Sequence, residues 1–172
     1  MRNSTAVQAS NVNRVLFIAV TSMALLLGGL FSAKSSFSSE TTLKPSTDLS
    51  PQQVINIVVE SLQNNAADDA GIATVYRFAS PGNKANTGPL ARFTYMIKRG
   101  FSDMLNHVGV RYDDMEITGD VAVQAVWLQT VTGAEYGYAF QLRKQKGGET
   151  DGMWMTEGVI PLGQSAQSGI GI

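Results

Sequence analysis

Three side chains in this sequence have the types that acid–base chemistry needs. Asp103 and His107 stand four residues apart, so a helix running through both would place a carboxylate beside an imidazole. Glu157 stands alone in the stretch GMWMTEGV, among large apolar side chains. A carboxyl group that is buried in such surroundings has a raised pKa and can act as a general acid. These three residues are the catalytic candidates.

Each candidate also has a structural interpretation, and the pattern favours it. A single pair at this spacing recurs by chance, and a histidine at the end of a helix is readily satisfied by the backbone or the helix dipole. In a strictly alternating strand, Glu157 lies on the face opposite Trp154 and Ile160. If those two residues face the helices, Glu157 lies on the outer face, solvated or at a subunit contact.

Metal, cofactor and nucleic-acid chemistry have little support in the composition. The chain has no cysteine and one histidine, which excludes a thiolate nucleophile and cysteine-ligated zinc or iron–sulfur clusters. The acidic run 113–116 lacks the alternating oxygen ligands and central glycine of a calcium loop. The glycines of 146–152 open no helix, as a phosphate cradle would. With a formal net charge of -1 and no basic stripe, we expect no metal, no cofactor and no nucleic acid.

Aromatic side chains are the more informative group for ligand binding. Core packing explains most of them, but a tyrosine hydroxyl or a tryptophan indole that projects into a cavity can orient an apolar ligand. The candidates for such a cavity are Tyr76, Tyr95, Trp127, Tyr138 and Trp154.

The first half of the region that must position these side chains has apolar residues at helical spacing. It predicts a helix over 51–64, with Ser50 as its cap and Gln53 completing a capping box. A shorter helix follows from Asp69 to about residue 79, and the breaker sequence 80–83 ends it. A third helix runs from Pro89 to Gly100, and a brief helical turn follows near 103–106.

After His107 the period of the apolar residues becomes that of strands. Strands are predicted over 108–117, 121–132, 135–145 and 153–161, joined by short turns that contain glycine. Helices followed by strands indicate an α+β fold, with about three helices packed on a curved four-stranded antiparallel sheet. Such a sheet wrapped over helices makes a cone, and its mouth is the natural place for a ligand.

The amino-terminal third of the chain differs from the rest in composition. Residues 15–33 form a 19-residue run without a charge, long enough to cross a bilayer, so they predict a transmembrane or signal helix after a short tail, 1–14. Retention as a single-pass anchor is favoured over cleavage, with the N terminus cytoplasmic or stromal and the domain opposite. The alternative is an exported soluble protein of the periplasm or thylakoid lumen. A flexible linker, 34–49, would lead to the α+β domain, 50–162, and a disordered tail, 163–172.

Two stretches of this sequence resemble a known family. They are YRFASPGNKANTGPLARFTYMIKRGFSDMLNH, from Tyr76 to His107, and WMTEGV, from Trp154 to Val159. Both are similar to the domain-of-unknown-function 4864 family of bacteria, cyanobacteria and plastid-bearing organisms. The resemblance covers about residues 50–162 and implies a cystatin-like cone similar to nuclear transport factor 2 and ketosteroid isomerase. It implies no activity, because fold alone is a poor guide to chemistry.

Two functional hypotheses from different classes follow. The favoured one is a membrane-tethered or exported module without enzymatic activity, which binds a ligand in a small apolar cavity or assembles as a homodimer or with a protein partner through its sheet. The alternative is a small isomerase- or hydratase-like enzyme that uses a pocket carboxylate and a tyrosine. The direction of the Glu157 side chain distinguishes them.

Overall fold

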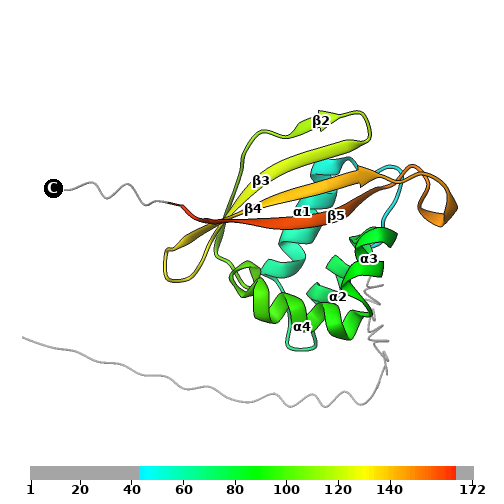
Figure 1. Ribbon diagram of the computed structural model, residues 1–172. Helices are drawn as coiled ribbons and strands as arrows, with labels where there is room; N and C mark the ends of the chain where they lie inside the picture. Colours follow the sequence, from blue (N-terminus) through cyan, green and yellow to red (C-terminus); the bar gives the residue numbers. More distant parts are fainter. Residues whose placement is uncertain (1–42, 166–172) are drawn as a thin grey trace, which may run out of the picture. The chain divides into compact units, whose positions relative to one another are not determined.

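The computed structural model describes residues 43–165, which form four α-helices and five strands (Figure 1). The helices are α1 (Pro51–Gln63), α2 (Ala70–Phe78), α3 (Pro81–Thr87) and α4 (Leu90–Gly100), with short 3-10 turns η1 (Ser102–Met104) and η2 (Gly148–Thr150). The strands are β1 (Gly109–Tyr112), β2 (Glu116–Thr118), β3 (Val121–Gln129), β4 (Glu135–Lys144) and β5 (Trp154–Gln164). The α+β class, with helices packed on an antiparallel sheet, is therefore confirmed.

Helix α1 begins where its capping signals predict. The Ser50 hydroxyl accepts a hydrogen bond from the Gln53 backbone N–H, and the Gln53 side chain accepts one from the Ser50 N–H. Two otherwise unpaired groups at the helix start are satisfied in this way. Pro51, whose fixed φ suits a first helical turn, follows the cap directly.

Residues 80–83 end the preceding helix α2 as expected, but a further helix, which was not predicted, begins there. Ser80 caps α3, its hydroxyl accepting from the Asn83 N–H, and Pro81 occupies the first helical position. This start repeats the Ser-Pro arrangement that opens α1. Proline and glycine end the preceding helix α2, but the same proline fits the start of the next one.

The sheet has the order β1-β3-β4-β5, and all of these neighbours are antiparallel. β2 also pairs with β3, beyond the end of β1, so the single strand predicted over 108–117 is divided in two. The interruption lies at Asp113, whose carboxylate accepts from the Trp127 indole N–H while its carbonyl accepts from the Gln124 amide. The Asp113 N–H still donates to the Ala125 carbonyl, but its own carbonyl accepts from a side chain instead of the backbone of β3, and regular pairing stops there.

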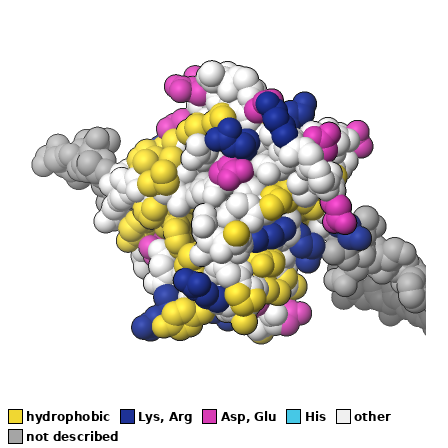
Figure 2. Space-filling model, turned by 45° about the vertical axis from the view of Figure 1, so that its right-hand side comes forward, with side chains coloured by type: hydrophobic (Ala, Val, Ile, Leu, Met, Phe, Trp, Pro, Cys, Tyr) yellow, Lys and Arg dark blue, Asp and Glu magenta, His cyan; other side chains and the backbone are white. Residues whose placement is uncertain are grey.

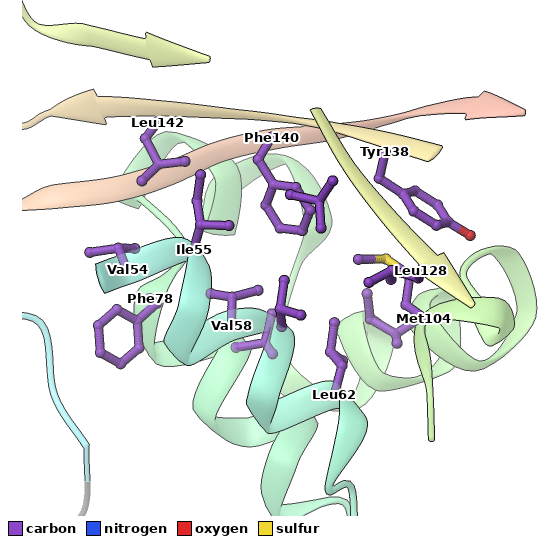
Figure 3. Packing of buried hydrophobic residues seen from close by; sticks show 14 of the residues in the cluster. Val54, Ile55, Val58, Leu62, Phe78, Met104, Leu128, Tyr138, Phe140 and Leu142 are labelled. Carbon is purple, nitrogen blue, oxygen red and sulfur yellow. The ribbon is translucent and has the colours of Figure 1, made fainter. Parts of the chain in front are cut away.

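The core lies between α1 and the inner face of the sheet. Figure 3 shows side chains of β4 directed towards those of α1, with Phe140 and Leu142 near Ile55 and Val58. All four of these side chains are 1% exposed or less. Because both layers present apolar side chains at the spacing of their own element, α1 and the sheet close on each other without water.

Strand β5 is longer and less regular than predicted. It continues to Gln164, which pairs with Tyr136, so residues 163 and 164 belong to the strand and not to the tail predicted over 163–172. A register shift lies between the pairs Gln141–Gly158 and Leu142–Thr156, so Glu157 is the extra residue of a bulge. The residues 1–42 and 166–172 lie outside the described part of the chain, and with them the predicted anchor or signal segment. No helix within 43–165 is long and apolar enough to cross a bilayer.

Candidate functional site

A cavity of about 220 Å³ lies among α1, α2, α3, α4 and β5. Its apolar wall comes from the core, and its polar side chains come from α3 and β5. The apolar lining residues are Val58, Leu62, Val75, Ala79, Phe93, Met96, Ile97, Phe101, Met104 and Val159. The remaining lining residues are Asn83, Asn86, Thr87, Thr156, Glu157 and Gly158. For comparison, a cavity of about 150 Å³ in a protein core binds benzene.

Helix α3 explains why this space is not filled by protein. Its sequence, PGNKANT, has no large apolar side chain, and none of its residues is buried. The neighbouring helices α1 and α4 both insert large apolar side chains into the core. The polar helix α3 lies over the core but inserts no apolar side chain into it. The apolar surface beneath α3 is therefore left without packing partners and becomes a cavity wall.

Glu157 lines the cavity instead of pointing away from the helices. Trp154, before the bulge, packs against the core as expected. The bulge reverses the alternation of β5, so Ile160, after it, is 58% exposed and faces outward. Glu157 Oε1 accepts a 2.9 Å hydrogen bond from the Gln145 side chain. Glu157 Oε2 lies 3.7 Å from the place a Cβ would occupy on Gly82 of α3. The expected outer-face position is therefore corrected, because strict alternation fails at a bulge.

Thr156 brings a second polar group to the same wall. It is 4% exposed and pairs across the sheet with Leu142, whose side chain packs on the helices. Its backbone carbonyl accepts from the Ser80 N–H and from the Asn83 side chain. Its hydroxyl has no hydrogen-bond partner within the described residues. A buried hydroxyl without a partner is costly to stability.

The polar side chains of α3 are largely occupied by each other. The Asn83 amide donates to the Thr156 carbonyl, and the Thr87 hydroxyl donates to the Asn83 carbonyl. Once its proton is engaged, the Thr87 oxygen can only accept. These bonds fix α3 to β5, while Asn86, which also lines the cavity, is exposed and has a side-chain amide that can donate or accept.

Asp103 and His107 do not form the expected pair. The helical turn η1 ends at Met104, and the ring Nδ1 of His107 lies 2.9 Å from the Met104 carbonyl oxygen, to which it must donate. His107 is 3% exposed, and its Nε2 has no hydrogen-bond partner within residues 43–165. Burial lowers the pKa of His107, an effect that the hydrogen bond with Met104 partly opposes. Neither residue lines the cavity.

The five aromatic candidates lie outside the cavity lining. The Tyr76 hydroxyl donates to the Gly88 carbonyl, and Trp154 packs against the core. Tyr95 is 62% exposed under the Arg99 guanidinium. Tyr138 is buried near Phe101, and burial together with the Asp103 charge raises its pKa to about 12.

Trp127 lies on the outer face of the sheet. Its register partners are Arg111 and Gly137, and the Arg111 guanidinium lies over its ring. A Cβ on Gly137 would come within 2.7 Å of that ring, so the glycine makes room for the indole. Trp127 is therefore not a cavity residue, because β3 directs its even-numbered side chains inward: Ala122, Gln124, Val126 and Leu128.

Sequence reasoning missed most of the cavity lining. Phe93 and Ile97 stand four residues apart, as the buried face of a helix requires, but nothing in the sequence indicates that they line a cavity. Asn83, Asn86 and Thr87 have helical spacing, which would have predicted a shared polar face if the start of α3 had been recognised. The described residues contain no group of three or more acidic or histidine side chains that could hold a metal ion.

Figure 2 shows the surface on the side of the domain that lies to the right in Figure 1. Exposed hydrophobic side chains form several groups there, with Lys, Arg, Asp and Glu side chains between them.

The fold and the cavity define a class of protein: a small α+β domain whose antiparallel sheet covers helices and encloses a ligand-sized space. The chain belongs to the family described as Domain of unknown function (DUF4864), whose profile matches residues 47–168. No curated protein and no solved structure matches the chain significantly.

Replacing Thr156 by valine tests whether its hydroxyl is truly unpaired. Thr156→Val keeps the shape and removes a group that has no partner, so we expect the free energy of unfolding to stay the same or rise by about 1 kcal/mol. Thr74→Val is the matched control: the Thr74 hydroxyl donates to the Ala70 carbonyl and accepts from Arg77. We expect this control to lower stability by about 1 kcal/mol. Urea denaturation measures both, and a loss in Thr156→Val equal to that of the control contradicts the assignment.

The pKa of His107 predicts how stability depends on pH. Because burial lowers it in the folded protein, the unfolded chain binds the proton more tightly, and stability falls as pH drops below about 6.5. His107 is the sole histidine of the chain, so His107→Gln should flatten the decline between about pH 5 and 7. Urea denaturation at a series of pH values measures the slope. If the free energy of unfolding depends on pH in the same way in the variant, other groups cause the decline.

Proposed function

We propose that this domain is a binding module for a small, mainly apolar molecule, which it holds in the cavity between the helices and β5. The observation that carries the proposal is the cavity itself, about 220 Å³ of space walled by core side chains. Apolar walls with a few converging polar groups are the usual composition of ligand sites. The polar groups lie together, on α3 and β5, so they would orient one end of the ligand.

The alternative enzymatic function is favoured by one observation, the presence of Glu157 in the cavity wall. An isomerase- or hydratase-like mechanism needs a second group that exchanges a proton with substrate or polarises its carbonyl. Among the described lining residues Glu157 is the only ionisable one, and no tyrosine accompanies it. The geometry therefore supports binding better than turnover.

Hexanol is a suitable probe because it has an apolar body and one polar end. We expect it to raise the free energy of unfolding by about 2.7 kcal/mol at about one hundred times its Kd. Ala79→Ile places extra carbon atoms at the cavity wall and should weaken binding at least tenfold. Ala139→Ile, opposite Ile160 on the outer face, is the matched control and should bind normally. Isothermal titration measures all three proteins, and equal binding in both variants would remove the cavity as the site.

The same proposal includes a fold relation to known proteins. Helices that precede an antiparallel sheet, with a cavity between the two layers, are the features that support a relation to the nuclear transport factor 2 and ketosteroid isomerase group. An experimental structure of the domain tests this relation through its strand order and helix placement.

We also propose that residues 15–33 hold the module at a membrane or direct its export. The support is the length and apolarity of this run and the arginine, Arg14, that precedes it. An anchor predicts an intact mass that includes the run and a protein found in the membrane fraction. A mature protein that begins near Lys34 contradicts the anchor and supports the exported form.

A further inference from the structure

We propose that the cavity selects ligands by their charge and takes a small alkyl or aryl amine, with its ammonium group on Glu157. This inference rests on the proposed binding function and names the class of ligand. It depends on which polar atoms around the cavity remain available.

The available polar atoms are mostly acceptors. Glu157 Oε1 receives the Gln145 amide, while Oε2 has no hydrogen-bond partner within residues 43–165. Thr156 lines the same cavity, but its unpartnered hydroxyl is enclosed by protein atoms. The Thr87 oxygen has given its proton to the Asn83 carbonyl and can only accept. A ligand head group that satisfies these atoms must be rich in donors.

The charge around the cavity has one sign. Glu157 is the only charged side chain among the described lining residues, and no lysine or arginine accompanies it. Lys84, the basic residue of α3, donates to the Arg77 carbonyl and lies over the Tyr76 ring. Neither Arg77 nor Tyr76 lines the cavity. Arg92 and Arg99 line a neighbouring pocket that shares Asn86, Thr87 and Met96 with the cavity. At Glu157 itself, a carboxylate or phosphate head group would meet like charge, whereas an ammonium group would form a charge-assisted hydrogen bond.

An ammonium group also suits the geometry of the wall. Thr156 and Glu157 are consecutive residues, and the bulge places both on the helix-covered side of β5. A primary ammonium has three donors, so it can bind the carboxylate and still donate to a second acceptor. The apolar body then extends over Phe93, Ile97 and Met104, which form the opposite wall.

Three probes with the same chain and different head groups test the selection: hexylamine, hexanol and hexanoate. At pH 7 we expect isothermal titration to give hexylamine a Kd at least about tenfold lower than that of hexanol, with hexanoate the weakest. Glu157→Gln removes the charge and keeps the shape, so it should abolish the preference for the amine while hexanol binding persists. Hexanol binding by the variant also shows that it is folded and that its cavity is intact.

Glu149→Gln is the matched control, since Glu149 is an exposed carboxylate in η2 and does not line the cavity. It should retain the preference for the amine in full. Equal affinities of the three probes for the unmodified protein, or a preference lost in both variants, would overturn the selection by charge and leave the binding function standing. If none of the three probes binds, the proposed binding function fails together with the inference.

Discussion

The packing of α1 against β3 and β4 is the interaction on which the rest of the domain depends. Val54, Ile55, Val58, Val59 and Leu62 form one face of the helix and are all 1% exposed or less. They meet the inward side chains of the sheet at interior density, and the burial of each large side chain contributes about 1.5–3 kcal/mol. Once α1 is fixed, α2 and α4 close one side of the core with apolar side chains. The short polar helix α3 completes the layer without filling the space beneath it, and the cavity results.

Much of this architecture could be predicted from the sequence because it follows from local signals. The capping box at Ser50 and the apolar spacing after it predict α1, and alternation predicts β3 and β4 to within a few residues. The helix α3 was missed for a local reason too. The Ser-Pro pair at residue 80 was interpreted only as the end of one element, although it has the same residue types as the start of α1.

The candidate site was harder to predict because it depends on register. Alternation assigns every residue of β5 to a face correctly until one extra residue enters the strand, after which each assignment is reversed. Glu157 is that residue, so the sequence pattern placed it on the wrong side. The interruption between β1 and β2 has a similar origin, since the bonds of Asp113 join residues far apart in the sequence. The cavity exists because the side chains of α3 do not fill the space beneath the helix. No single residue type in the sequence predicts such a space.

The proposed binding function requires a small molecule to enter the space between the helices and β5. The methionine methyl groups report on it directly, because Met96 and Met104 line the cavity whereas Met115 and Met153 do not. In a titration of ¹³C-methyl-labelled protein with hexylamine, followed by NMR, the account predicts saturable shifts of the Met96 and Met104 signals and little change at Met115 and Met153. Shifts confined to the latter two, or no saturation at any methyl group, would contradict it.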